Sequence, residues 1–232
     1  MNPTTSQRRL FFSAFSAFLS CWVTIADAAP DAQEILSASR MNQVSQSARL
    51  AAELRDSDGK RTPFVIALDG GVIDYDFESG PDISLRLFEN SAELTERSRG
   101  SRSEVSPAKQ DQRVMDTPIT YEDLALQFLY WPRAKVNGEE KIYGRQCWEL
   151  EIQAPRGRSQ YGVVRVWVDK ETGAIMQMRG YNDDGKPIKH FKVTSAQKLD
   201  GQWMLKEMRV EALSPKSGKP VERAYLVVKD KL

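Results

Sequence analysis

The sequence is poor in the residues that most metal sites and catalytic motifs require. His190 is the single histidine among 232 residues, so a zinc site built from several histidines is excluded. No Gly-x-Ser-x-Gly motif occurs, and no glycine-rich loop ends in Gly-Lys-Ser or Gly-Lys-Thr. Asp56–Gly59 and Asn182–Gly185 resemble the start of a calcium loop, but neither continues to a glutamate at the twelfth position. We therefore expect no metal site and no enzyme activity, and we interpret both segments as turns.

The chain also lacks an excess of either charge. Of its 33 basic and 32 acidic residues, two arginines and one aspartate lie in residues 1–28, so residues 29–232 carry 31 of each sign. Nucleic-acid binding depends on a surplus of Lys and Arg that neutralises phosphates. We expect no nucleic-acid partner.

The first 28 residues have the pattern of a secretory signal peptide. Two arginines at positions 8 and 9 precede a mostly apolar run, Leu10–Val23, and an Ala-Asp-Ala triplet ends at Ala28. The run is too short to span a bilayer stably, which takes about 20 apolar residues. The sequence predicts a signal peptide at residues 1–28, followed by one domain at residues 29–232.

Cys21 allows a second interpretation of this segment. Phe18–Cys21 loosely matches a lipobox with Cys21 as the lipidated residue, although phenylalanine is a poor first residue and the apolar run continues past the cysteine. After simple export, Cys147 is the one cysteine left, so no internal disulfide is expected. Cys147 lies beside Trp148 in a predicted strand, which indicates a buried structural thiol.

The exported part begins with a helix and continues as strands. Asp31 and Glu34 form a capping pair, and apolar residues recur at helical spacing as far as Val44. From Ala48 onward apolar and polar residues alternate, and turns such as Asp69–Gly71 separate the alternating segments. This pattern predicts an N-terminal helix and a meander of β-hairpins.

Residues 97–116 interrupt the alternation. Basic residues, serines and acidic residues are mixed there with Pro107. This composition is typical of a polar, mobile loop. The loop is either a solvated segment or a docking surface for a protein partner.

Thr120–Pro132, TYEDLALQFLYWP, is predicted to be a helix. Thr120 and Asp123 have the spacing of an N-cap and its partner, and Pro132 ends the helix. The apolar side chains between them point around almost the whole circumference, so no polar face is left for solvent. Burying six such side chains is worth on the order of 10 kcal/mol. We predict that this helix lies inside the protein.

The strand pattern returns after this helix, with turn sequences about every ten to twelve residues. Some strands, such as Val163–Val168, are apolar on both faces. The predicted fold class is mainly β (α+β): a curved antiparallel sheet, or incomplete β-barrel, wrapped around or covered by the buried helix. An apolar cavity and a filled core are both consistent with this pattern.

These segments together resemble the LolA-like outer-membrane lipoprotein-sorting family. The resemblance covers Asp31 to Leu232 and rests on YEDLALQFLYWP, CWELEI, YGVVRVWVDKETGAIMQM, YNDDGKPIKHFKV and DGQWMLKEMRVE. Tyr121–Trp131 and Val166–Asp169 are its most specific parts, and it is closest to the uncharacterised branch of the family. The resemblance implies an incomplete barrel closed by helices, with an apolar cavity for acyl chains, no catalytic residues and no cofactor. No functional residue is carried over from the LolA and LolB carriers.

Seven residues are candidates for the lining or lid of such a cavity. They are methionine, aromatic and leucine side chains, which suit a flexible apolar ligand: Leu124, Phe128, Trp131, Trp148, Trp167, Met176 and Met178. The alternative is that these side chains form an ordinary core.

The favoured function is an exported, non-enzymatic carrier or sensor that holds the acyl chains of lipoproteins or other lipids. Such a protein would work in the periplasm, in outer-membrane lipoprotein sorting, and would contact membranes only transiently. A carrier shields acyl chains whose exposure to water costs about 0.8 kcal/mol per CH₂. The helix at 120–132 would occupy the cavity when it is empty and yield to a ligand. The alternative function is a LolA-fold interaction module that binds an envelope protein.

Overall fold

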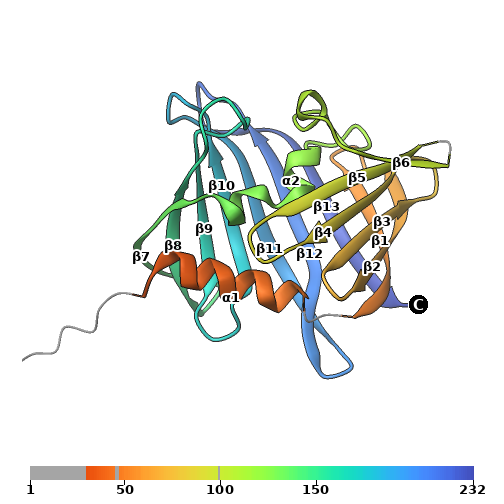
Figure 1. Cartoon of the computed structure of the whole chain (residues 1–232), viewed down its shortest axis with the longest axis horizontal. Coiled ribbons are helices and arrows are strands. Elements are labelled where there is room, and N and C mark those ends of the chain that lie inside the picture. Colours follow the sequence, from red (N-terminus) through yellow and green to blue (C-terminus); the bar gives the residue numbers. More distant parts are fainter. Residues whose placement is uncertain (1–29, 45–46, 99) are drawn as a thin grey trace, which may run out of the picture.

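One curved antiparallel sheet forms most of the molecule (Figure 1). The computed structural model describes residues 30–44, 47–98 and 100–232, so the predicted signal peptide and Cys21 lie outside the described residues. In the described part, thirteen strands pair in the order β6-β5-β4-β3-β2-β1-β13-β12-β11-β10-β9-β8-β7. The predicted fold class is confirmed: the protein is mainly β, with a curved, open antiparallel sheet and a few helices.

The elements follow one another closely along the chain. The strands are β1 (Ala48–Asp56), β2 (Arg61–Asp69), β3 (Val72–Phe77), β4 (Asp82–Leu87), β5 (Ala92–Ser98), β6 (Ser101–Glu104), β7 (Arg133–Ile142), β8 (Arg145–Gln153), β9 (Val163–Asp169), β10 (Ile175–Tyr181), β11 (Pro187–Leu199), β12 (Gln202–Leu213) and β13 (Pro220–Lys231). The helices are α1 (Ala32–Val44), α2 (Tyr121–Ala125) and two 3-10 turns, η1 (Pro107–Lys109) and η2 (Gln127–Tyr130). Among the described residues, no helix is both long and apolar enough to cross a membrane.

One strand pairing and one long crossover determine the order of the strands in the sheet. Most neighbours in the sheet are also consecutive in sequence, but β1 pairs with β13, which brings the first and last strands together at its centre. The segment between β6 and β7 joins the two opposite edges of the sheet, and it carries α2 and η2 across one face. This face, on which α1 also lies, is the inner face of the curved sheet (Figure 1).

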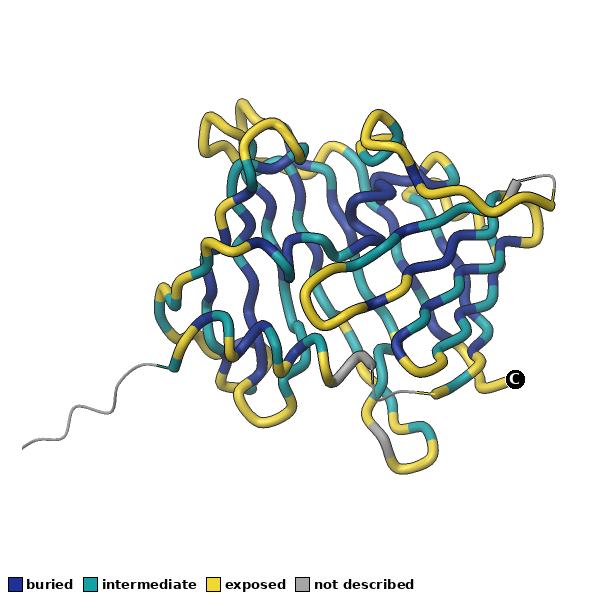
Figure 2. The backbone as a smooth tube through the Cα atoms, viewed as in Figure 1, coloured by how far each residue is buried: buried dark blue, intermediate teal, exposed yellow. Residues whose placement is uncertain are grey.

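The core lies between the inner face and the helices. Val164, Val166 and Val168 of β9 are almost completely buried in it, and Figure 2 shows the buried residues on the sheet and along α2. The intervening residue Trp167 points to the outer face, where it packs with Ile142 and Cys147. A second, small cluster therefore accounts for the apolar residues on the outer face of this strand. The prediction that Cys147 is a buried thiol is confirmed.

The prediction of a loop at residues 97–116 was wrong for its first part. β5 and β6 form a hairpin that pairs with β4 and ends the sheet. All four residues of β6 are exposed, because a strand at an edge is held by backbone hydrogen bonds and requires no apolar face. Further along, Val105 and Val114 are buried against the core, so this segment is not simply solvated.

The predicted helix at Thr120–Pro132 forms, but it is broken. Its N-terminus has the expected capping box, in which Thr120 and Asp123 exchange side-chain and backbone hydrogen bonds. α2 then stops because Leu126 takes a left-handed conformation, with φ of 50°, and η2 continues in a new direction. Phe128 and Leu129 of η2 are both buried, and the carbonyl of Leu129 accepts a hydrogen bond from Arg40 of α1 at 2.5 Å.

Candidate ligand cavity

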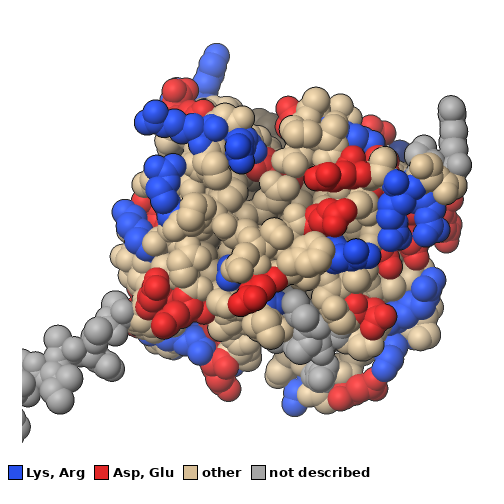
Figure 3. Space-filling view, in the orientation of Figure 1, with Lys and Arg blue, Asp and Glu red and all other residues tan. Residues whose placement is uncertain are grey.

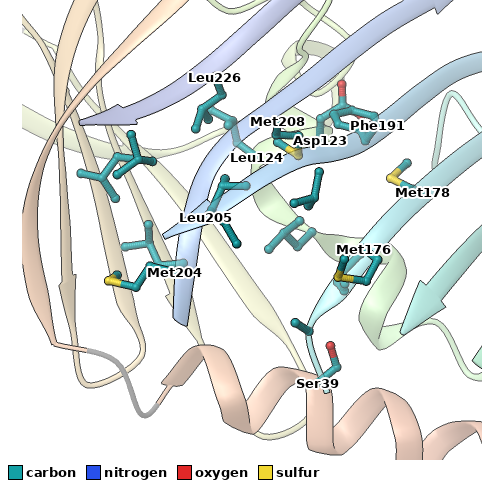
Figure 4. A pocket seen from close by; sticks show the side chains of 18 of the residues that line it. Ser39, Asp123, Leu124, Met176, Met178, Phe191, Met204, Leu205, Met208 and Leu226 are labelled. Atoms are coloured by element: carbon teal, nitrogen blue, oxygen red, sulfur yellow. The ribbon is translucent and has the colours of Figure 1, made fainter. Parts of the chain in front are cut away.

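An apolar cavity lies between the inner face of the sheet and the helices. Its volume is about 380 Å³, and its lining comes from β1–β3, β10–β13, α1, the segment before α2, α2, Leu126 and η2. Most of the lining is apolar, and part of it is drawn in Figure 4. It includes Ile66, Ile73, Leu124, Met178, Phe191 and Leu226. Ligand pockets in proteins typically have roughly 300–1,000 Å³. The interior is therefore not a completely filled core.

Four of the seven candidate residues line this cavity. Leu124 and Phe128 line it from α2 and η2, and Met176 and Met178 line it from β10. Figure 4 labels Leu124 and the two methionines. Phe128 and Met178 are both buried. The structure thus brings together the two segments that the sequence singled out as apolar and adaptable.

The three tryptophan candidates lie outside the lining. Trp131 is buried just after η2, and its carbonyl accepts a hydrogen bond from the Gln33 amide of α1 at 3.1 Å. Trp148 packs at the margin of the core, with the Lys170 ammonium 3.5 Å from its ring centre. Trp167 is on the outer face and donates from Nε1 to Glu140 at 2.7 Å. The contacts of these three tryptophans stabilise the fold around the cavity.

Several lining residues were missed by sequence reasoning. They come mainly from the hairpin of β11 and β12 and from β2 and β3: Ile66, Leu68, Ile73, Phe191, Val193, Met204, Leu205 and Met208. Met204 and Met208 are unbranched, adaptable side chains like the methionines of β10, so the same argument from residue type applies to them. The others alternate with polar residues like any strand facing a core, so their pattern contains nothing specific to a cavity.

The cavity is open to solvent beside the tip of the β11–β12 hairpin. Trp203 contributes to its lining and is nevertheless 61% exposed, and Ala196 of the same hairpin also lines it and is exposed. Figure 3 shows the face that carries the helices: uncharged atoms fill much of its middle, and charged side chains gather around its margins. Trp203 and Ala196 therefore mark the place where a ligand would enter.

The inner end of the cavity is polar and fully paired. Asp123 lines it, and its carboxylate accepts hydrogen bonds from Lys189 at 2.6 Å, from the Tyr161 hydroxyl at 2.5 Å and from the Thr120 amide at 2.8 Å. Burial raises the pKa of Tyr161 well above its usual range, and the nearby Asp123 charge adds to this, so the hydroxyl keeps its proton. Asp123 is thus already occupied by protein donors.

Glu122 lies next to this cluster. It is buried, and one carboxylate oxygen accepts from the Gln160 amide at 3.1 Å. Burial raises its pKa, an effect that hydrogen bonds from Ser159 and Gln160 partly oppose. The group anchors the segment before β9 to α2.

No arrangement suited to a metal is found among residues 30–44, 47–98 and 100–232: none brings three His, Cys, Asp or Glu side chains together. His190 is half-buried on the outer face, with Nδ1 3.7 Å from the Glu211 carboxylate. Burial lowers its pKa to about 4, so it is neutral at pH 7. His190 is not among the residues that line the cavity.

Comparisons with known proteins agree with this fold. A family model described as an uncharacterized protein matches residues 99–220, more than half of the chain. No curated protein matches the chain.

Three solved structures share the fold over most of their length. A DUF1329 family protein from Desulfovibrio piger is 19% identical, with a TM-score of 0.66 over 88% of this chain and 93% of that one. A domain assigned to outer membrane lipoprotein sorting, from Vibrio parahaemolyticus, is 16% identical, with a TM-score of 0.63 over 86% and 91%. A LolA superfamily protein from Nitrosomonas europaea is 18% identical, with a TM-score of 0.61 over 88% and 93%.

Proposed function

The chain belongs to this uncharacterized, LolA-like family, and on that premise we propose that it is a non-enzymatic carrier or sensor that holds a lipid acyl chain. The observation that carries the proposal is the cavity of about 380 Å³ between sheet and helices. Its lining is mostly apolar, and it opens beside the exposed Trp203. An acyl chain is the common biological ligand that is apolar along its whole length and flexible enough for such a space.

The energetics favour this ligand. Each methylene moved from water into an apolar site gains about 0.8 kcal/mol, so a chain of ten methylenes gains on the order of 8 kcal/mol before the cost of ordering it. Met176, Met178, Met204 and Met208 surround this space with unbranched, adaptable side chains. The cavity can therefore accept chains that differ in length or unsaturation.

The cellular role extends this proposal. Residues 1–28 would direct export to the periplasm, and residues 29–232 would form the domain that carries the ligand. The name of the Vibrio parahaemolyticus domain gives lipoprotein sorting as the role of a protein of this fold. Lipoprotein acyl chains are accordingly the ligand that we propose, with transient contact to a membrane or an envelope protein when they are loaded or released.

Native mass spectrometry tests the proposal directly. The processed protein is purified without detergent from a Gram-negative host, and its mass is compared before and after activation in the gas phase. Adducts that leave as fatty acid, phospholipid or acylated peptide are expected. A bare protein mass, together with no change in the emission of a fluorescent acyl ester upon addition of protein, would contradict the carrier and leave a protein-binding module as the better model.

A matched pair of variants ties the ligand to this cavity. Ala196 lines the mouth and is exposed, so Ala196→Trp places an indole in the entrance at little cost to folding. Ala108 is an exposed alanine outside the lining, and Ala108→Trp is the control. We expect Ala196→Trp to weaken the binding of a fluorescent acyl ester at least tenfold and Ala108→Trp to leave it unchanged.

A further inference from the structure

One polar atom in the apolar wall of the cavity has no partner. Ser39 lies in the last part of α1 and is only 1% exposed, yet it lines the cavity. Among the described residues, its Oγ makes no hydrogen bond. Figure 4 shows the hydroxyl pointing from α1 toward β10, on the side where Met176 lies.

A hydroxyl in this situation requires an explanation. Nearly all buried polar side chains of folded proteins are hydrogen-bonded, and one left unpaired destabilises the fold. A serine within a helix often solves this problem by bonding to the carbonyl four residues earlier. Ser39 does not do so, although Ile35 is at that position in α1. Its hydroxyl remains available to a molecule in the cavity.

The surroundings of Ser39 are rigid. The turn between β9 and β10 packs directly on α1: a Cβ placed on Gly173 would lie 3.8 Å from the carbonyl oxygen of Ala38 and 4.0 Å from Cα of Ser39. Asp169 holds this turn in place, because its carboxylate accepts two hydrogen bonds from Arg145, at 2.7 and 2.8 Å, and one from the Thr172 amide at 2.8 Å. Ser39 therefore lies beside a well-packed, hydrogen-bonded turn in the cavity wall.

We infer that the Ser39 hydroxyl donates a hydrogen bond to the carbonyl oxygen of an ester- or amide-linked acyl chain in the cavity. This inference rests on the proposed function and names the group that is recognised. The carbonyl oxygen of such a linkage accepts hydrogen bonds and donates none, which matches a single hydroxyl beside Ala174, Ile175 and Met176.

An ionised carboxylate fits this position less well. One neutral donor does not offset the cost of burying a charge. Among the described residues, the lining contains no lysine or arginine. Lys189 lies behind it, bound to Asp123, whose own negative charge would repel a fatty-acid carboxylate. The site thus selects acyl esters and amides, the linkages found in lipids and lipoproteins, over free fatty acids at neutral pH.

The test compares two ligands that differ in this carbonyl. Palmitoyl lysophosphatidylcholine carries an ester, and its hexadecyl ether analogue has the same headgroup and chain length without the carbonyl. Calorimetric titration of the wild-type protein should show the ester binding about three- to tenfold more tightly, the range expected for one net hydrogen bond. In Ser39→Ala the two ligands should bind equally, at the affinity of the ether for the wild type.

Two controls make the result specific. Ser84 is a buried serine outside the cavity lining, and Ser84→Ala should keep the preference for the ester. Ser39→Ala should also melt no lower than the wild type without ligand, because it removes an unpaired hydroxyl. If Ser39→Ala does not fold, the comparison of ester and ether affinities in the wild-type protein still tests whether the cavity recognises the carbonyl.

Equal affinity of the wild type for ester and ether would overturn the inference and leave the proposed function standing. So would a Ser39→Ala variant that weakens both ligands to the same extent. Failure of the folded wild type to bind either ligand would count against the carrier function as well.

Discussion

The ammonium of Lys189 on β11 donates a hydrogen bond to the carboxylate of Asp123 on α2 over 2.6 Å, and both side chains are buried. The Tyr161 hydroxyl donates to the same carboxylate from the segment before β9. This contact fixes the position of α2 against the sheet at the inner end of the cavity. The carboxylate of Asp123, in the first turn of α2, thus holds this helix over the cavity.

Lys189→Met is expected to destabilise the protein strongly. It leaves the Asp123 charge buried without its cation, and breaking a buried ion pair from one side typically costs about 3–5 kcal/mol. Urea unfolding followed by tryptophan fluorescence measures the loss. Lys192 lies on the same strand but faces the Tyr143 ring on the outer face, so Lys192→Met is the matched control. A Lys189→Met variant as stable as this control would show that the pair contributes nothing.

Gly180→Ala is expected to lose stability because the Tyr161 ring lies against the backbone of β10. A Cβ at position 180 would come within 2.1 Å of a ring carbon of Tyr161, so the ring has to move away from its place over the sheet. Overpacking of this kind typically costs about 1–3 kcal/mol. Gly138 of β7 has no heavy atom within 4 Å of such a Cβ, so Gly138→Ala should change the free energy of unfolding little. Equal losses for the two variants would refute the argument.

Acid should remove the stabilisation provided by Asp169. Hydrogen bonds from the Arg145 guanidinium and from Thr172 lower its pKa from 3.8 to about 2, against the opposing effect of burial. A carboxyl whose pKa is lower in the folded state stabilises it above the unfolded pKa, and the effect disappears as the pH falls from about 4 to about 2. The shift corresponds to about 2 kcal/mol.

The comparison with Asp169→Asn isolates this effect from the other acids. At neutral pH the wild type should be more stable than the variant by about 2 kcal/mol, and the difference should shrink toward zero near pH 2. Urea unfolding at a series of pH values gives both curves. A difference that stays constant with pH would assign the stabilisation to geometry alone.

Much of the fold could be predicted because alternation and turn chemistry are local. Asp56–Gly59 and Asn182–Gly185 are turns, α1 ends at Val44 and β1 begins at Ala48 where the periodicity changes, and the Thr120–Asp123 capping box forms as its spacing indicates. The hairpin of β5 and β6 was missed because an exposed edge strand is stabilised by its neighbour's backbone. Its own side chains therefore show no apolar period.

The cavity could be predicted only in part. The methionines of β10 and the apolar run at 124–128 pointed to it, but the left-handed turn at Leu126 has no signal in a leucine. After that turn, Phe128 lines the cavity and the carbonyl of Leu129 accepts a hydrogen bond from Arg40 of α1. Ser39 lies on a helix face whose burial depends on the β9–β10 turn, more than 130 residues away in the chain. Its isolation from hydrogen-bond partners is a property of the assembled structure.

Phe128→Ala tests whether α2 and η2 limit what the cavity holds. Phe128 is 3% exposed and lines the cavity, so its removal should cost about 3–5 kcal/mol and enlarge the space. Longer acyl chains should then gain affinity relative to shorter ones, and saturating ligand should recover part of the lost stability by mass action. Affinities for acyl esters of increasing chain length, with melting temperatures at each, provide both readouts.

Trp131→Ala is the control for this experiment. Trp131 is also buried, at 6% exposed, but lies outside the lining. Its truncation should lower stability by a similar amount without changing the preferred chain length, because the new space is separated from the ligand. If both variants shift the preference alike, α2 and η2 move as one unit when ligand enters. If neither yields folded protein even with ligand, the two segments are an integral part of the core, and the proposal that they yield to an entering acyl chain fails.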